Sequence, residues 1–349
     1  MRTIQAGQYL IGEGQPCFIA AEAGINHNGD IRLAHELIDA AVAAGADAIK
    51  FQNYQTEDFV SSQSLTYEYQ SQGQRVVETQ FEMFKRCELS LSSLKELREH
   101  CDEKRIVFFS TPTSERGIDE LVRVGAPFLK NGSDYLVHLP LIRAMARTQL
   151  PAVLSTGMAT LAEIDEAVRA FREAGGDKLI LLHCTSSYPT PPEDVHLRKI
   201  PTLAAAFDCL CGFSDHTQGV VAAVGAVALG ACFIEKHFTI DKNLAGPDHW
   251  FSSDPAGLRE LVNAVRAVEK NLGSTAVGPT PSEIQGRDAF RLSCVAAKNL
   301  PKGHKLTETD VAFQRSAGGL LPRDIHLIIG RHLRSSLMLG EPIRGEALG

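Results

Sequence analysis

Residues 210–237 contain two short apolar runs that each pass directly into polar residues: Leu210-Cys211-Gly212-Phe213-Ser214-Asp215-His216 and Phe233-Ile234-Glu235-Lys236-His237. Six more apolar runs of this kind precede them, at residues 18–21, 48–51, 107–109, 128–130, 152–154 and 179–182. Apolar residues recur at a helical spacing in the segments around these runs, for example over 31–44, 161–174 and 258–272. The sequence therefore predicts eight strands that alternate with helices.

Strands that are apolar throughout and alternate with helices form parallel sheets covered on both faces. Eight such units favour an α/β fold of the (β/α)8 TIM-barrel type. A doubly wound sheet is the weaker interpretation, because its Gly-rich turn after the first strand is absent from Ile25-Asn26-His27-Asn28-Gly29. We assign residues 1–272 to the barrel.

The C-terminal part of the chain has a different pattern. Residues 273–290 are rich in Gly, Ser, Thr and Pro, which is typical of a linker. Residues 300–311 repeat the apolar and glycine spacing of residues 337–348. This repeat predicts a small β-rich domain at 291–349, which is near the lower size limit for independent stability.

The composition restricts the class of protein. The 349 residues carry 35 Lys and Arg against 42 Asp and Glu, a formal net charge of -7, so a nucleic-acid partner is not expected. No apolar run approaches the roughly 20 residues of a bilayer-spanning helix, and the first residues lack an apolar leader. The eight cysteines lie in apolar segments and are expected to be reduced. We expect a cytoplasmic protein without membrane association.

Polar residues follow all eight predicted strands, at the end where TIM barrels carry their active sites. Strand alternation places Lys50 on the face opposite Ile49 and Phe51, and therefore inside the barrel mouth. A buried ammonium such as that of Lys50 needs a carboxylate such as Glu22 or an anionic ligand to compensate its charge. Lys130 has the same requirement. Two lysines beside Ser and Thr hydroxyls predict a receptor for phosphate and carboxylate, although a structural pair of Lys50 with Glu22 remains an alternative.

His216 and His237 close two strands that are neighbours in a barrel, so both imidazoles can reach one point. Two histidines without thiolates fit Mn²⁺ or a similar divalent cation better than structural zinc. The alternative is that each is a hydrogen-bonded core residue. His183, on the sixth strand, is expected to be either a structural residue or one that supports a ligand of the site from behind. The long interval at residues 56–90 predicts a lid or substrate wall, whose Tyr67, Tyr69 and Phe81 can stack on a ligand or on each other.

These motifs together resemble the sialic acid (nonulosonate) synthase family, and the tail from Arg291 resembles the antifreeze-like (SAF) domain of that family. The resemblance extends over essentially the whole chain and depends on residues 21–29, 49–52, 110–112, 154–159, 188–189, 212–217, 235–239 and 246–249.

The resemblance implies that phosphoenolpyruvate (PEP) condenses with an open-chain N-acylated mannose-type aldose, giving a nine-carbon 2-keto acid and phosphate. It implies that His216 and His237 bind Mn²⁺. The residues expected to hold PEP are Lys50, Thr111, Lys130, Ser133, Ser186 and Ser214. Those expected to hold the sugar are Glu22, Gln52, Tyr188 and Asp248. Arg315 matches an arginine that reaches the N-acyl group in the partner subunit's site, which implies a domain-swapped homodimer.

One departure from the family pattern concerns an acid expected two residues after Ser133, where this chain has Tyr135. Asp134 precedes it and can substitute if the loop rotates. The predicted catalytic residues are therefore Glu22, Lys50, Lys130, Asp134, His216 and His237. The alternatives are another PEP-dependent 3-deoxy-2-ketoacid synthase, a metal aldolase, or a non-catalytic sugar- or ice-binding protein. The sequence leaves open whether the aldose is N-acetylmannosamine or a 2,4-diacetamido-2,4,6-trideoxyhexose.

Overall fold

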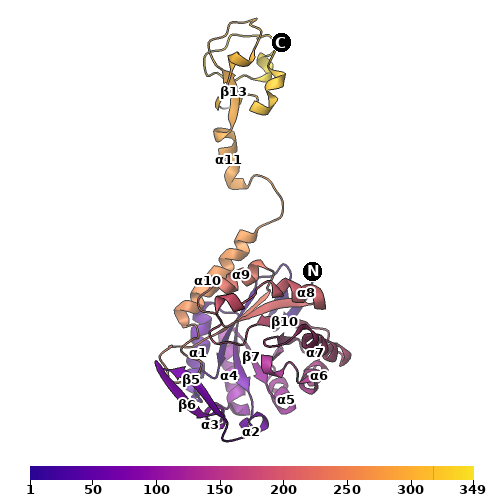
Figure 1. Cartoon of the computed structure of the whole chain (residues 1–349), viewed down its shortest axis with the longest axis vertical. Coiled ribbons are helices and arrows are strands. Elements are labelled where there is room, and N and C mark those ends of the chain that lie inside the picture. The colour runs from indigo at the N-terminus through magenta and orange to yellow at the C-terminus, as the bar shows by residue number, and fades with distance from the viewer. Residues whose placement is uncertain (317) are drawn as a thin grey trace. The chain divides into compact units, whose positions relative to one another are not determined.

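A computed structural model describes residues 1–316 and 318–349 of the chain. The chain divides into two compact units, Met1–Gly273 and Ser274–Gly349, which are described separately. Figure 1 shows strands surrounded by helices in the first unit and short strands and turns in the second.

The first unit contains an eight-stranded parallel sheet with the order β7-β4-β3-β12-β11-β10-β9-β8. The outermost strands of this order, β7 and β8, also lie against each other, so the sheet closes into a barrel. All eight predicted runs fall on its strands, and the TIM-barrel prediction is confirmed. The strands are β3 (Phe18–Gly24), β4 (Ala48–Asn53), β7 (Val107–Pro112), β8 (Leu129–Asn131), β9 (Ala152–Ser155), β10 (Leu179–Cys184), β11 (Leu210–Asp215) and β12 (Phe233–His237).

Helices connect these strands, and several begin at side chains that cap them. Asp30 accepts a hydrogen bond from the Arg32 amide at the start of α1, and Thr160 forms a reciprocal capping box with Glu163 at the start of α7. The helices are α1 (Ile31–Ala44), α4 (Leu91–Lys104), α5 (Glu115–Arg123), α6 (Leu139–Arg147), α7 (Leu161–Glu173), α8 (Lys199–Phe207), α9 (Val221–Ala228) and α10 (Pro255–Leu272). Within the described residues, no helix is both long and apolar enough to cross a membrane.

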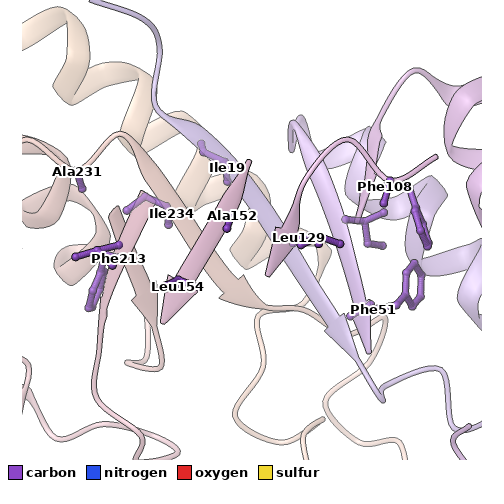
Figure 2. Packing of buried hydrophobic residues seen from close by; sticks show 14 of the residues in the cluster. Ile19, Phe51, Phe108, Leu129, Ala152, Leu154, Phe213, Ala231 and Ile234 are labelled. Atoms are coloured by element: carbon purple, nitrogen blue, oxygen red, sulfur yellow. The ribbon is translucent and has the colours of Figure 1, made fainter. Parts of the chain in front are cut away.

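Strand alternation separates two apolar layers. One face packs under the helices through residues such as Ile19, Phe51 and Phe108, which Figure 2 shows on their strands. The other face fills the barrel interior with residues such as Phe109 and Phe233. The hairpin of β1 (Thr3–Ala6) and β2 (Tyr9–Gly12) packs against this inner layer and closes the amino-terminal end of the barrel. Polar side chains are therefore left to the carboxyl-terminal end.

The interval between β4 and β7 forms a small subdomain. It contains α2 (Thr56–Phe59), the antiparallel hairpin of β5 (Thr66–Ser71) and β6 (Gln74–Thr79), and α3 (Gln80–Lys85). Figure 1 shows this hairpin at one edge of the first unit, and β6 contacts α3. Tyr54, Phe59 and Phe84 pack with Ile25 and Cys87 and anchor the subdomain to the strand ends.

The second unit contains α11 (Pro281–Phe290), an antiparallel pair of β13 (Leu292–Ala296) and β14 (Val311–Arg315), and isolated bridges such as Leu300 with Leu337. Its core includes Cys294, Leu300, Leu306, Leu333, Leu337 and Ile343. Both copies of the predicted repeat thus supply core residues. Helix α11 lies inside the segment 273–290 that the composition predicts as a linker.

Candidate active site

The carboxyl ends of the barrel strands and the loops after them surround a cavity of about 460 Å³. All the barrel residues that the sequence analysis proposes for the site line this cavity, and Arg315 belongs to the second unit. The residues are Glu22, Lys50, Gln52, Thr111, Lys130, Ser133, Asp134, Ser186, Tyr188, Ser214, His216, His237 and Asp248. They come from seven separate strand ends or loops, which the closed sheet brings together.

Two buried lysines form the deep part of the cavity. Lys50 Nζ donates to Thr111 Oγ1 at 3.0 Å and lies 3.2 Å from Glu22 Oε1. Lys130 Nζ lies 3.4 Å from Glu235 Oε1, and the same oxygen is 3.5 Å from Lys50 Nζ. The alternation argument for Lys50 is confirmed, and its ion pair with Glu22, the structural alternative, is also present.

This group of two lysines and two carboxylates is only loosely paired. Among the described residues, Glu22 Oε2 and Glu235 Oε2 are buried without a hydrogen-bond partner. Burial raises the pKa of Glu22 and lowers the pKa of Lys130. Burial also opposes ionisation of Glu235, but Lys130 and Lys50 outweigh it and its pKa falls below the usual value. Buried polar atoms without partners lower stability unless a ligand satisfies them, so this region is suited to binding a polar ligand.

Hydroxyl groups cluster beside Lys130. Ser133 Oγ donates to Ser155 Oγ at 3.0 Å and accepts from the Gly157 amide at 3.1 Å. A Cβ atom at Gly157 would collide with the hydroxyls of Ser133 and Ser186, so the close approach requires glycine. Ser186 Oγ is buried without a partner among the described residues. Small donors around a backbone amide are the groups that hold phosphate oxygens.

The imidazoles of His216 and His237 lie next to each other, with ring centroids 5.3 Å apart. His216 Nδ1 donates to the Thr185 carbonyl at 2.8 Å, which leaves its Nε2 for another partner. Burial lowers the pKa of His237, and its Nδ1 has no hydrogen-bond partner among the described residues. A neutral imidazole with a free nitrogen, beside a second ring oriented by a carbonyl, fits the requirements of a metal ligand pair.

A metal at this position would need ligands besides the two imidazoles. Within residues 1–316 and 318–349, no group of three or more His, Cys, Asp or Glu side chains is arranged to hold an ion. Two protein ligands leave open coordination positions, which is the arrangement of catalytic rather than structural metal sites. The side chains therefore fit a divalent cation completed by substrate and water.

Around the imidazoles lies the part of the cavity expected to hold a sugar. The ring centroid of Tyr188 is 4.2 Å from that of His216, and Phe251 lies 5.3 Å from Tyr188. Asp248 Oδ2 is 3.8 Å from His237 Nδ1, and burial raises the pKa of Asp248 to about 6. This region offers ring faces and one carboxylate to a neutral polyhydroxy compound.

Asp134 and Tyr135 both line the cavity from the single 3-10 turn η1 (Ser133–Tyr135). Burial raises the pKa of the Asp134 carboxyl, and Lys130 and Lys50 act in the opposite direction. The turn therefore presents Asp134 to the cavity as it stands, and its catalytic role stays a prediction.

Comparison with known families and proteins agrees with this geometry. The NeuB family model matches residues 37–276, and the SAF domain model matches residues 293–348. The chain belongs to the NeuB family. The SAF match falls in the second unit, as predicted for the C-terminal β-rich domain.

Among the relatives of this NeuB-family chain, an uncharacterized protein of Methanocaldococcus jannaschii is 44% identical over 96% of this chain and 95% of its own length. The N,N'-diacetyllegionaminic acid synthase of Legionella pneumophila is 40% identical, over 96% of this chain and 95% of its own length. The crystal structure of the N-acetylneuraminic acid (sialic acid) synthetase of Leptospira borgpetersenii, in complex with citrate, has a TM-score of 0.74 at 35% identity and covers 83% of this chain and 97% of that chain.

The sequence analysis of this NeuB-family chain missed Glu235, which faces both lysines. Strand alternation could have found it, because Glu235 and His237 share a face of β12. It also missed Tyr54, Phe59, Met83 and Phe84, which line the outer cavity. Of the aromatics proposed for the 56–90 segment, Tyr67 lines the cavity, whereas Tyr69 and Phe81 do not. Tyr67 stacks on Tyr69 at 5.8 Å, so the alternative that these rings stack on each other also holds.

His183 has a structural role, one of the two that the sequence leaves open for it. Its Nε2 donates to the Val195 carbonyl at 2.5 Å, and the buried ring stacks on Phe213. It is not among the residues that line the cavity. His183 therefore serves below as a control for the two cavity histidines.

Proposed function

We propose that this protein is a nonulosonate synthase. It condenses PEP with the open-chain form of an N-acylated mannose-type aldose and releases inorganic phosphate. The observation that carries the proposal is the joint placement, in one cavity, of two buried lysines, the hydroxyls around Gly157 and a pair of adjacent imidazoles. The family membership and the names of the two relatives support it.

PEP carries a carboxylate and a phosphate, and the deep part of the cavity has donors for both. Lys50 and Thr111 lie on one side, and Lys130 with Ser133 and Ser186 on the other. An incoming anion meets ammonium groups whose carboxylate partners lie at 3.2 to 3.5 Å, longer than a strong charge-assisted hydrogen bond, while each lysine also donates to one neutral oxygen at 2.9 to 3.0 Å. The anion can therefore compete for these lysines.

The reaction joins C3 of PEP to the aldehyde carbon of the sugar, and the aldehyde oxygen gains a proton to become a hydroxyl. Water adds to C2 of PEP, and the bond between C2 and the bridging oxygen breaks to give a ketone and inorganic phosphate. Lys50 and Lys130 can offset the charge that develops as phosphate departs. Asp134 and Glu22 are placed to accept or supply protons, because burial raises the pKa of both carboxyls.

His216 and His237 are the residues that would hold a divalent cation such as Mn²⁺. When bound there, the cation supplies Lewis-acid polarisation of a carbonyl oxygen and orientation of water. Tyr188, Gln52 and Asp248 line the cavity around these histidines and orient the sugar.

The proposal extends to the assembly and the compartment. Arg315, on the exposed strand β14, reaches the N-acyl group in the site of a partner subunit, which requires a domain-swapped homodimer. The cysteines recorded in the described residues are all free, which fits a reducing compartment, so the proposal places the enzyme in the cytoplasm.

The test is phosphate release that requires PEP, Mn²⁺ and an aldose, measured with N-acetylmannosamine and with 2,4-diacetamido-2,4,6-trideoxymannose. Mass spectrometry should show a nine-carbon keto acid. Absence of phosphate release above a chelator-treated control with every aldose would overturn the proposal. His216→Ala and His237→Ala should each abolish Mn²⁺-dependent phosphate release with a nearly unchanged melting temperature. His183→Ala should lower the melting temperature, and its phosphate release should still depend on Mn²⁺.

A further inference from the structure

The cavity has two walls of different chemistry. Its deep wall carries the lysines and carboxylates at the strand ends, where the proposed function places PEP. Its outer wall is largely aromatic and apolar, and most of it comes from the segment between β4 and β7. The outer-wall residues from this segment are Tyr54, Phe59, Tyr67, Gln80, Met83 and Phe84, of which Gln80 alone has a polar side chain without a ring or thioether.

The aromatic part of the outer wall is a packed unit. The rings of Tyr54, Phe59 and Phe84 contact one another edge to face, with centroids 4.9 to 5.5 Å apart. The Tyr54 hydroxyl donates to the Phe84 carbonyl at 3.1 Å, so it is already satisfied. These three rings therefore present hydrocarbon surface to the cavity, and the polar groups of the wall are the Tyr67 hydroxyl and the Gln80 amide.

Asp248 links this wall to the imidazole pair. Its carboxylate lies 3.8 Å from His237 Nδ1. Asp248 and Tyr67 line the same cavity, and the negative charge of Asp248 adds to burial in raising the pKa of Tyr67. Asp248 thus lies between the imidazoles, where the aldehyde end of the sugar belongs, and the aromatic residues. The outer wall faces the opposite end of the sugar chain.

Among the described residues of the first unit, no lysine or arginine lines this outer end, and the cation proposed for the site from a partner subunit, Arg315, is assigned to the N-acyl group. Among the described residues that line the cavity, the only lysines or arginines are Lys50 and Lys130, and both face Glu22 or Glu235 in the deep part. A phosphate on the far carbon of the sugar would lose its hydration without gaining a charged donor, which is unfavourable.

We propose that the outer wall selects an uncharged aldose with apolar ends: a bis-N-acylated hexose whose C6 is a methyl group. The acyl methyls and the C6 methyl pack on the wall, while a 6-hydroxyl or a 6-phosphate does not. This inference rests on the proposed function and specifies its substrate class. Phe59, Met83 and Phe84 are the residues that determine this specificity.

The test compares kcat/KM for phosphate release with three aldoses: 2,4-diacetamido-2,4,6-trideoxymannose, N-acetylmannosamine and N-acetylmannosamine 6-phosphate. We expect the trideoxy sugar to exceed N-acetylmannosamine by about 10- to 100-fold, the range for small apolar groups in apolar pockets, and the 6-phosphate to be the poorest. Equal or better use of either 6-oxygenated sugar overturns the inference but leaves the proposed function standing. Failure of all three sugars refutes the proposed function itself.

A variant pair tests whether the wall is responsible. Phe84→Ala removes a ring that lines the cavity, and Phe81→Ala removes a ring of the same helix α3 that does not. We expect Phe84→Ala to reduce the preference for the trideoxy sugar at least fivefold and Phe81→Ala to leave it unchanged. If Phe84→Ala fails to fold, Met83→Gln, which keeps the volume and adds an amide, should reduce the same ratio. An unchanged ratio in the folded variant contradicts the assignment.

A second inference concerns a buried ion pair that the proposed mechanism does not use. Asp215 and Lys236 are register partners on β11 and β12, and Lys236 Nζ lies 2.8 Å from Asp215 Oδ2. Both are buried, and each immediately precedes one of the two cavity histidines. Because alternate residues face opposite sides of a strand, the pair lies behind the imidazoles rather than beside them.

The pair holds the backbone on both sides of His216. Asp215 Oδ1 accepts from the Thr217 amide at 2.8 Å and from the Thr217 hydroxyl at 2.7 Å. Lys236 Nζ donates to the Thr217 carbonyl. One side chain from each histidine-bearing strand thus fixes the turn that carries His216.

We infer that Asp215 and Lys236 are positioning residues that keep the two imidazoles at a metal-binding separation. Groups that orient metal ligands from behind typically change metal affinity 10- to 100-fold when removed. The double variant Asp215→Leu/Lys236→Met removes both charges together and leaves neither one buried without its partner.

The experiment measures Mn²⁺ binding to the full chain by electron paramagnetic resonance, without substrates, together with the melting temperature. The double variant should bind Mn²⁺ at least tenfold more weakly, and Lys236→Arg, which keeps the charge, should recover part of the affinity. The matched control is Asp47→Leu/Arg266→Met, which removes an ion pair of 2.8 Å at the amino end of β4. It should lower the melting temperature with unchanged Mn²⁺ affinity. The inference fails if both double variants change the Mn²⁺ affinity by the same factor. It also fails if the Asp215/Lys236 double variant does not fold and Lys236→Arg binds Mn²⁺ with the affinity of the parent and unchanged kinetics.

Discussion

The barrel and the C-terminal unit each bury carboxylates among cations, but they satisfy them differently. In the barrel, the oxygens of Glu22 and Glu235 that have lysine partners lie 3.2 to 3.5 Å from them. The second oxygen of each has no partner among the described residues. In the C-terminal unit, Asp310 accepts hydrogen bonds of 2.7 to 2.9 Å from Lys298, His304 and Thr307 on its two oxygens.

The cluster around Glu22 and Glu235 has unused hydrogen-bonding capacity, which fits a ligand-binding site. The cluster around Asp310 has none left, which fits a structural role. Saturated hydrogen bonding stabilises a structure and leaves no capacity for binding. Unpartnered oxygens and long ion pairs lower stability, and their persistence in the barrel is explained if a ligand completes them. The predictions below test this difference.

The largest effect is expected from Lys50→Met. This change removes the ammonium that faces both barrel carboxylates, and with it a donor to the developing phosphate charge. The rate of phosphate release at saturating substrates should fall by about 10²- to 10³-fold, as when one oxyanion donor is lost. A rate within a factor of three of the parent would show that the barrel cluster is structural.

The paired variant Lys130→Met/Glu235→Leu should separate activity from stability. Replacing a loosely satisfied buried ion pair with apolar residues is often neutral or stabilising, by about 1 to 4 kcal/mol. We expect an unchanged or higher free energy of unfolding of the barrel in urea, and no phosphate release. Marked destabilisation would mean that this pair contributes to the fold, as Asp310 does.

In the C-terminal unit, Asp310→Asn should lower stability by about 2 kcal/mol, the contribution of hydrogen bonds to a charged group. Lys298, His304 and Thr307 hold the pKa of Asp310 well below its usual 3.8. The carboxylate therefore stabilises the folded unit above about pH 4, and this contribution is lost as the pH falls below that value. Unfolding followed from pH 7 to pH 3 should show a loss of stability in the parent that is smaller in Asp310→Asn.

The smallest effect is expected from Thr307→Ala. Thr307 Oγ1 donates to Asp310 Oδ2 at 2.7 Å and forms a capping box in the short 3-10 turn η3 (Glu308–Asp310). Its removal should lower the free energy of unfolding by about 1 kcal/mol. Phosphate release should not change, and Thr309→Ala, two residues further on, serves as the control because its hydroxyl contacts that of Thr307 and not the Asp310 carboxylate.

Much of the fold could be predicted because each barrel strand ends where apolar residues give way to polar ones. The same boundary located Lys50, Lys130, His216 and His237, since closing a parallel sheet gathers the carboxyl ends of its strands. The alternation of side chains along the strand was also enough to predict on which face of the sheet Lys50 lies.

The rest depended on contacts between distant segments. The pairing of Glu235 with both lysines requires the register of β12 against its neighbours, which no local pattern contains. The aromatic wall requires the fold of the 56–90 segment, where Tyr67 faces the cavity while Tyr69 donates to Glu78. The Asp215–Lys236 pair likewise becomes visible only when the strands are aligned.

The hairpin of β1 and β2, which closes the amino-terminal end of the barrel, has a kinetic consequence. Side chains of the inner layer fill the barrel and the hairpin covers its amino-terminal end, so reactants enter the cavity from the carboxyl-terminal end. If PEP binds in the deep part and the sugar nearer the opening, as proposed above, a bound sugar would block the path of PEP. We therefore expect PEP to bind before the sugar and phosphate to leave after the keto acid.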